Sequence, residues 1–261
     1  MPEDVVIWRM GIFFGVILAL IVVERVSPRR KLSQKQSRRW ASNLGIFIVD
    51  SVLTRVLVAA GGIAVAAYAA RQGWGLFNII DAPAWAVLIA TLIILDFAVW
   101  AQHVFSHKWQ WFWRLHRMHH SDLDIDVTTA LRFHPLEIVV SLIYKSVVIV
   151  LLGPPLMAVF IFEIALNSCA MFNHSNIKLP LWLDRILRPI IVTPDMHRVH
   201  HSTDRREHNH NFGFCLSVWD RLFRLYTAQP REGHKGMEIG LSEFRREGQQ
   251  GVGALLVQPL K

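Results

Sequence analysis

Three clusters of histidines constrain the fold of this 261-residue chain more strongly than any other feature of its sequence. They read His103-Val-Phe-Ser-His107, His116-Arg-Met-His119-His120 and His197-Arg-Val-His200-His201. Spacings of three and four residues place the imidazoles of each cluster on one face of a helix. Each cluster lies just after an apolar run, which suggests a polynuclear metal site facing lipid. To form one site the clusters must converge, and this predicts a single membrane domain over residues 1–261.

The composition indicates an integral membrane protein. Hydrophobic residues make up 52% of the chain and the mean hydropathy is +0.32, which is too apolar for a soluble domain of this length. The net charge of +8 is concentrated at residues 25–39, between two apolar runs. Basic residues beside membrane spans mark the cytoplasmic side and contact anionic headgroups, so we expect a membrane and not a nucleic acid as the partner.

Apolar runs at about residues 5–23, 44–70 and 83–101 predict three membrane-spanning helices, because each can cross about 30 Å of hydrocarbon. A fourth run, 136–172, is interrupted by Gly153-Pro154-Pro155. Proline breaks a helix, so this run is expected to form a helical hairpin that returns the chain to the same face.

The predicted fold is therefore an all-α integral membrane protein with about three transmembrane helices, a helical hairpin and a cytoplasmic, histidine-rich helical cap. Its expected parts are the N-terminal spans (1–101), a catalytic histidine region (102–227) and a C-terminal tail (228–261). The amphipathic segment 181–192 is expected to lie at the membrane interface.

The histidines predict a metal site, because metals bind neutral imidazoles that are held in a fixed orientation. The three clusters contain eight of the 13 histidines, and His174 is a candidate ninth ligand. Glu163, Asn167 and His174 lie at spacings of four and seven, so they share a stripe on an apolar helix. Polar groups there are costly and usually face a site. The alternative is a helix-packing hydrogen bond from Asn167 and a surface position for His174.

Three further polar residues are possible metal ligands or partners that orient a ligand. His134 precedes Pro135 and could be a ligand, an orienting partner or a helix cap. Asp96 lies on the helix face of His103 and could orient its imidazole or pack helices together. Asn173 directly precedes the candidate ligand at the end of the hairpin.

Other polar residues are not expected to bind metal. The aspartates at residues 122–126 do not form a calcium loop, because Val127 and Phe133 stand where glycine and glutamate are required. His208 and His210 are expected to be solvated residues that flank the last cluster. The tryptophans near the spans are expected to form an interfacial belt.

The ordered histidine clusters resemble the sterol desaturase/fatty acid hydroxylase superfamily, and above all its bacterial members. The likeness covers about residues 90–227. Supporting stretches are Leu131-Arg132-Phe133-His134-Pro135-Leu136-Glu137, Asn173-His174-Ser175-Asn176, Asn209-His210-Asn211-Phe212-Gly213 and Trp219-Asp220-Arg221-Leu222-Phe223.

The resemblance implies a di-metal oxygenase, normally with two iron ions, for which zinc can substitute in purified material, and with O2 as co-substrate. The implied ligands are His103, His107, His116, His119, His120, His174, His197, His200 and His201. Some branches of the superfamily carry one more histidine where this chain has Ala170, and His134 could compensate for it. No cytochrome b5 domain is fused to the chain, so electrons are expected from a separate cytochrome b5-like protein, ferredoxin or reductase.

The function expected from this resemblance is hydroxylation or desaturation of a lipid C–H bond. The lipid would be sterol-like, fatty acyl or isoprenoid, and the active site would lie on the cytoplasmic side of a bacterial inner membrane. Alternative enzymes are an alkylglycerol monooxygenase-like ether-lipid cleaver, which a pterin requirement would favour, and a carotenoid hydroxylase. Outside the enzymes, a metal transporter would take up metal into vesicles, and a b-haem protein would show a Soret band.

Overall fold

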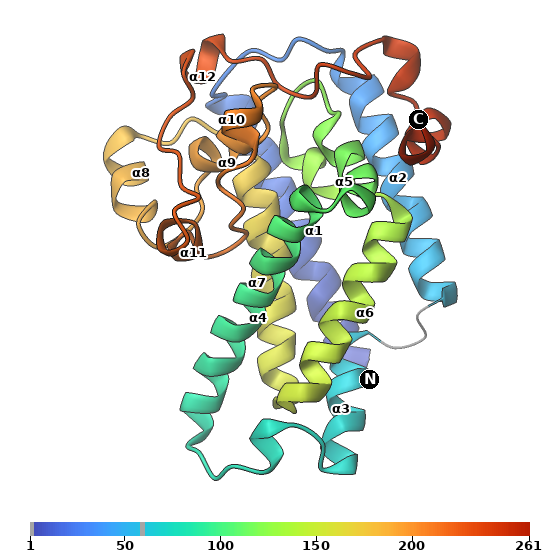
Figure 1. Cartoon of the computed structure of the whole chain (residues 1–261), viewed down its shortest axis with the longest axis vertical. Helices are drawn as coiled ribbons and strands as arrows, with labels where there is room; N and C mark the ends of the chain where they lie inside the picture. The colour runs from blue at the N-terminus through green and yellow to red at the C-terminus, as the bar shows by residue number, and fades with distance from the viewer. Residues whose placement is uncertain (1–2, 58–60) are drawn as a thin grey trace.

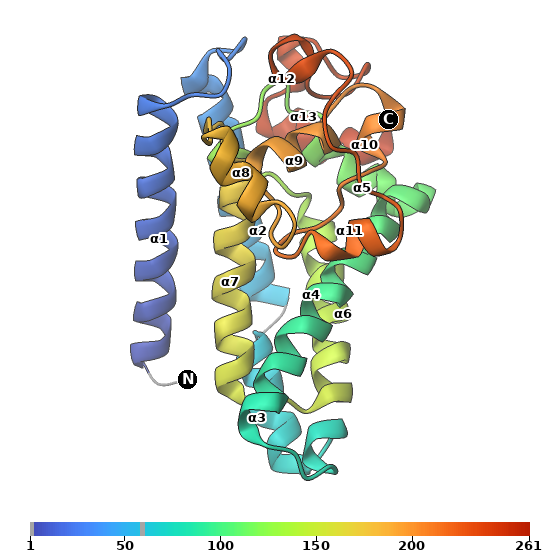
Figure 2. The same ribbon diagram turned by 90° about the vertical axis from the view of Figure 1, so that its left-hand side faces the viewer.

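The computed structural model describes residues 3–57 and 61–261, and the regular elements in this part of the chain are all helices (Figure 1). Six helices form an elongated bundle, and the other elements form a cap at one end of it (Figures 1 and 2). The bundle helices are α1 (Glu3–Val26), α2 (Gln36–Leu57), α3 (Gly62–Gln72), α4 (Ala84–Lys108), α6 (Pro135–Leu152) and α7 (Leu156–His174). The cap helices are α5 (Gln110–His120), α8 (Leu181–Leu187), α9 (Pro194–His200), α10 (Arg205–His208), α11 (Val218–Leu222), α12 (Gly233–Gly236) and α13 (Val252–Leu256). Short 3-10 turns lie at Leu76–Asn78, Val127–Leu131, Glu247–Gln249 and Gln258–Leu260.

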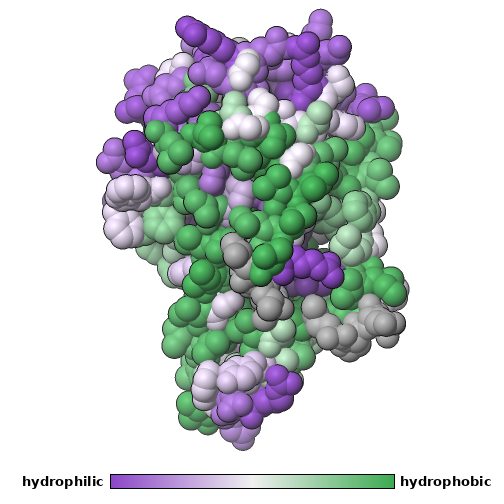
Figure 3. Space-filling view, turned by 90° about the vertical axis from the view of Figure 1, so that its right-hand side faces the viewer, coloured by the Kyte–Doolittle hydropathy of each residue, from purple (hydrophilic) through white to green (hydrophobic). Residues whose placement is uncertain are grey.

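Four of the described helices are long and apolar enough to cross a membrane: Val5–Val26, Ala84–Lys108, Pro135–Leu152 and Leu156–His174. Side chains on these helices that face outward are largely hydrophobic. Figure 3 shows hydrophobic residues along the bundle, with hydrophilic residues over the cap and at the opposite tip. The predicted all-α membrane fold is confirmed.

The second predicted span differs from the expectation, because its residues are divided between α2 and α3. Residues 58–60 of this run lie outside the described residues. The α3 helix starts at Gly62, where a Cβ atom would lie 2.7 Å from Glu163 Oε1 and 3.1 Å from Ile149 Cδ1. The absence of a side chain at Gly62 thus lets α3 pack closely against α6 and α7.

The predicted hairpin is present, and Gly153 ends its first arm. Gly153 has φ +62°, in the left-handed region that glycine adopts readily, and its N–H donates to the carbonyl of Ile149. Pro155 then precedes α7. The α3 and α4 helices each pack against both arms of the hairpin. The apolar core between them consists of Ile63, Ala66, Leu95, Val99, Ile149, Leu152, Val159 and Phe162.

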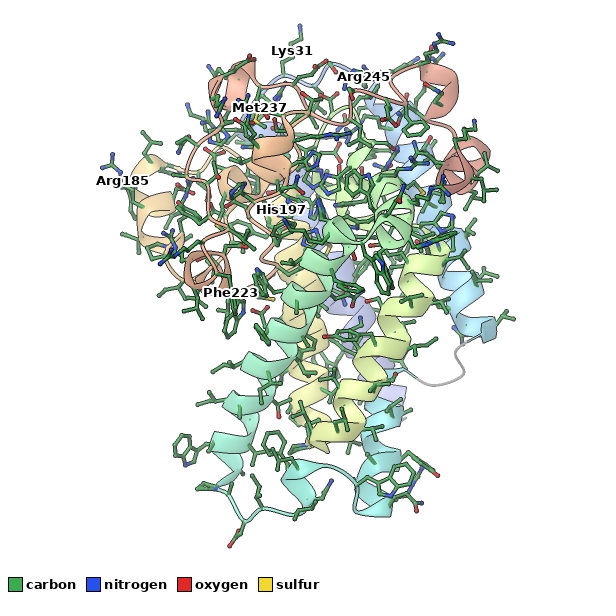
Figure 4. The ribbon with its side chains drawn as sticks, viewed as in Figure 1. Lys31, Arg185, His197, Phe223, Met237 and Arg245 are labelled. Carbon is green, nitrogen blue, oxygen red and sulfur yellow. The ribbon has the colours of Figure 1, made fainter. Side chains whose placement is uncertain are left out.

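The loop between α1 and α2 lies at the cap end of the bundle, where Lys31 is labelled in Figure 4. The basic segment and the histidine-rich cap therefore share one end of the molecule, as the predicted topology requires. Part of this basic segment is folded into the cap and does not face headgroups. Arg39 is 6% exposed, and its guanidinium pairs with Asp122 and Asp126 at 2.8 and 2.6 Å.

Candidate metal centre

Four segments that are distant in the sequence bring nine histidines together where the cap meets the bundle. They are the last turns of α4, the end of α5, the end of α7 and the α9 segment, and His197 marks the place in Figure 4. The histidines form two groups, and in each group the candidate ligand atoms lie within 4.8 Å of one another. The first group is His103, His107, His116, His120 and His200, and the second is His119, His174, His197 and His201.

Local sequence signals place these side chains. The extended backbone of Trp109 separates α4 from α5, so the first two clusters lie on two helices that meet at this residue. The α9 helix begins with Pro194 at its first position, and the Thr193 hydroxyl accepts a hydrogen bond from the N–H of Met196. The ends of α4, α5 and α9 therefore bring all three histidine clusters to the same region of the protein.

Hydrogen bonds at Nδ1 determine the tautomers of five ligand candidates. A carbonyl or carboxylate oxygen can only accept, so a nitrogen bonded to one carries the proton. The Nδ1 atoms of His103, His119, His174 and His200 donate to the carbonyls of Phe212 (2.7 Å), Arg132 (3.1 Å), Ala170 (2.7 Å) and His210 (2.8 Å). His116 Nδ1 donates to Glu137 Oε1 at 2.6 Å. In the neutral imidazoles, Nε2 is left with a lone pair.

These lone pairs converge at distances that fit bound metal. His103 Nε2 lies 3.1 Å from both His116 Nε2 and His200 Nε2. In the second group, His174 Nε2 lies 3.0 Å from His119 Nε2. Two lone pairs at this distance repel each other unless a cation lies between them. Nitrogens about 2.1 Å from one metal and at right angles to each other lie about 3.0 Å apart, so the observed separations match ligands of a shared ion.

Burial keeps the imidazoles of these histidines neutral, which is the form that binds metal. It is the main cause that holds the pKa values of His119, His120, His197, His200 and His201 well below the ordinary histidine value, and the neighbouring imidazoles add to it. Both ring nitrogens of His201 are buried and lack a hydrogen-bond partner among the described residues. A buried imidazole of this kind is costly unless it binds a ligand, which also fits metal coordination.

Several residues that support the site were not identified from the sequence. The sequence showed Glu137 only as the last residue of a stretch that supports the family resemblance, yet its carboxylate accepts a hydrogen bond from Nδ1 of His116. Asp220 accepts hydrogen bonds at 2.9 Å from the N–H groups of Phe212 and Gly213 and from Trp100 Nε1. It thereby orders the loop whose carbonyl holds His103. Both lie in stretches that carried the family resemblance, but their contacts depend on the tertiary fold.

The aspartates at residues 122–126 pair with protein groups and hold the segment after α5 in place. Burial alone would raise the pKa of Asp122, but the Arg39 guanidinium holds it well below its usual range. Asp124 accepts from the N–H groups of Ser33 and Gln34 at 2.8 and 2.7 Å. These contacts join the loop after α1 to the residues that follow the second histidine cluster.

Four candidates lie outside both histidine groups. His134 caps α6, where Nδ1 accepts from the N–H of Leu136 and Nε2 donates to the carbonyl of Leu256, each at 3.2 Å. The Asp96 carboxylate accepts from Trp219 Nε1 at 2.8 Å and from two amides of the same loop, so it packs elements together. Glu163 pairs with Arg9 at 3.0 Å, and Asn167 donates to the carbonyl of Glu163.

A fifth candidate, Asn173, also lies outside the groups, and its side chain donates to the carbonyl of Phe214 at 3.0 Å. Two other residues lie closer to the histidines than expected. His208 was expected to be solvated but is buried, with its ring 5.4 Å from Trp113 and 5.8 Å from His107. Trp113 itself lies 4.9 Å from the His107 ring, so it belongs to the wall of the site and not to an interfacial belt. The His210 side chain remains outside both groups.

A cavity of about 270 Å³ lies beneath the first histidine group, between α2, α4, α6 and α7. His103 and His116 form part of its wall, together with Asp50, Glu137 and Lys145. A second cavity of about 510 Å³ opens between α1, α2 and α7. The two cavities share the lining residues Phe13, Phe47 and Asn167. The shared wall residues place the two cavities next to each other.

Residues 88–225, more than half of the chain, match the family described as fatty acid hydroxylase, and the chain belongs to this family. Ornithine lipid hydroxylase OlsE of Rhizobium tropici is 26% identical over 245 residues, which are 90% of this chain and 71% of that protein. Human alkylglycerol monooxygenase is 29% identical over 174 residues, or 66% of this chain and 38% of that protein. The zebrafish (Danio rerio) alkylglycerol monooxygenase is 29% identical over 175 residues, with the same coverage. No solved structure matches the chain.

These comparisons confirm the class of protein that the sequence predicted. The chain is an oxidoreductase of a lipid hydroxylase family, and its relatives and apolar helices indicate an integral membrane protein with a lipid substrate. The histidine groups and the monooxygenase relatives indicate the use of a metal and O2.

Proposed function

We propose that the chain is a di-iron oxygenase that hydroxylates or desaturates a lipid C–H bond at the cytoplasmic face of a bacterial inner membrane. The convergence of Nε2 lone pairs in two separate histidine groups carries this proposal. Five histidines in one group and four in the other fit two metal ions side by side. Imidazole suits iron, zinc and copper, and the oxygenase family favours iron among them.

In this proposal the nine histidines hold the two irons. Iron, when bound, supplies the oxygen chemistry that side chains lack. The protein positions the ligand nitrogens and the lipid, and it excludes water from the site. Glu137 and the backbone carbonyls keep the Nδ1 protons in place, so that the ligand nitrogens face inward. The cavity beneath His103 and His116 admits one part of a lipid and brings it next to the first group.

The proposed orientation of the protein in the membrane rests on the position of its basic residues. The basic segment at residues 25–39 and the histidine site lie at the same end of the bundle, and an excess of Lys and Arg marks the cytoplasmic side. A separate electron donor of the cytochrome b5-like, ferredoxin or reductase type would then reach the site from the cytoplasm.

A lipid analysis tests the proposed reaction. Membranes of a host that expresses the full chain are expected to contain a lipid heavier by one oxygen atom, or lighter by two hydrogen atoms, only when O2 is supplied. His119→Ala should abolish this product. His234→Ala is a matched control, because His234 is buried but belongs to neither histidine group. Full product formation by His119→Ala would contradict the proposal.

A further inference from the structure

One carboxylate in the wall of the 270 Å³ cavity has no protein partner that accounts for its burial. Asp50 of α2 is 7% exposed, and its Oδ1 has no hydrogen-bond partner among the residues that the structure describes. The same cavity reaches His103 and His116 of the first histidine group. An unpaired buried carboxylate is strongly unfavourable, so its presence beside a cavity indicates a ligand that supplies the missing donor.

A second carboxylate faces the same cavity. Glu137 is 6% exposed; its Oε1 accepts from His116, whereas its Oε2 is buried without a partner among the described residues. Lys145 also lines the cavity, but it makes no ion pair with Asp50 or Glu137 in the described part of the chain. Two carboxylates that share a cavity repel each other, and a cation with several N–H donors removes both penalties at once.

We propose that Asp50 and Glu137 bind a primary ammonium group in the polar headgroup of the lipid substrate. An ammonium carries three donors and one positive charge, which match the free carboxylate oxygens of the two residues. The headgroup end of the lipid therefore enters the cavity, and the oxidised carbon lies close to the ammonium. This inference rests on the proposed lipid oxygenase function and narrows its substrate to an amine-bearing lipid.

The position of the two carboxylates fits a headgroup. Glu137 lies in the first turn of α6, at the end of a candidate span that is next to the cap, and α2 with Asp50 packs against this helix. Lipid headgroups lie at the ends of membrane spans. The second cavity adjoins the first, and its wall combines apolar side chains such as Met10, Phe13 and Ile164 with the charged residues Arg9, Arg55 and Glu163. It offers a path for the acyl chains.

A binding measurement on the purified full chain tests the inference without any need for turnover. The probes are hexadecylamine and N-acetylhexadecylamine in nonionic detergent, which share a chain and differ in the ammonium charge. The wild type should bind the amine on the order of tenfold more tightly than the amide, equivalent to about 1.4 kcal/mol. Asp50→Asn and Asp50→Ser should lose most of this preference, because Glu137 alone then faces the ammonium, and their affinity for the amide should be unchanged. The control is Ser51→Ala, which should keep the preference for the amine, because the Ser51 hydroxyl donates to the carbonyl of Phe47 in its own helix.

Equal binding of the two probes by the wild type, or an undiminished preference in both Asp50 variants, would overturn the inference. Butylamine, which has the ammonium without the chain, should not compete with hexadecylamine at equal concentration. Competition would assign the site to a soluble amine and overturn the lipid part of the proposal. Because binding is read without catalysis, an inactive protein that keeps the preference would contradict the oxygenase proposal alone.

Discussion

The smallest feature on which the site depends is the proton on Nδ1 of five ligand candidates: His103, His116, His119, His174 and His200. Glu137 differs from the carbonyl acceptors because it is charged, so it strengthens His116 as a ligand more than a neutral acceptor does. The clusters themselves could be recognised from the sequence, since helical spacing alone places their imidazoles together. Glu137 could not be identified in this role, because its partner lies 21 residues away in another helix.

Replacement of Glu137 by glutamine tests this contribution. The glutamine carbonyl can still accept the proton of His116, but without charge, so we expect metal affinity to fall roughly 10–100-fold while the fold is retained. Competition with a chelator measures the affinity. The control is Glu163→Gln, which makes the same chemical change in a residue outside both histidine groups. Equal metal retention by Glu137→Gln and wild type would show that His116 needs no charged partner.

At the scale of elements, the hairpin could be predicted because Gly153-Pro154-Pro155 interrupts an otherwise continuous apolar run. The division of residues 44–70 between α2 and α3 was not predicted, although Gly61-Gly62 is a local turn signal directly before α3. The close packing of Gly62 against α6 and α7 is a tertiary contact that no local pattern encodes. The burial of Arg39 could not be predicted from the sequence either, because its aspartate partners follow it by more than 80 residues.

The end of α6 provides a test of element packing with a matched control. A Cβ on Gly153 would lie 2.3 Å from the carbonyl oxygen of Trp74, whereas a Cβ on Gly73 would meet nothing within 4 Å. Both glycines have φ near +65°. Gly73→Ala should therefore cost only the backbone strain, about 1 kcal/mol, and Gly153→Ala should cost about 1–3 kcal/mol more. Unfolding in detergent measures the difference, and equal losses would show that this contact does not stabilise the bundle.

On the scale of the whole molecule, the basic loop after α1 and the two histidine groups lie at the same end of an apolar bundle. The loop after α1 carries basic residues and contacts the cap through Asp124, whereas the turn between α3 and α4 lies at the opposite tip. The convergence of the clusters could be anticipated from the hairpin topology. The division of the histidines into groups of five and four could not, because each group draws on helices from different clusters.

The proposed orientation can be measured in intact cells and spheroplasts. A membrane-impermeant maleimide should label Asp81→Cys, at the tip opposite the cap, from the outside. It should label Lys31→Cys, at the cap end, only after the membrane is opened. The unaltered chain, with Cys169 and Cys215 both partly buried, is the background control. Labelling of Lys31→Cys in closed spheroplasts would place the histidine site on the outer side.

The metal content of the detergent-purified chain tests the central claim most directly. We expect about two irons per chain in the wild type, with iron lost from His200→Ala in the first group and from His119→Ala in the second. His234→Ala should keep the wild-type content. A wild-type protein without stoichiometric metal, or with haem in its place, would contradict the assignment of the two histidine groups as a di-metal centre.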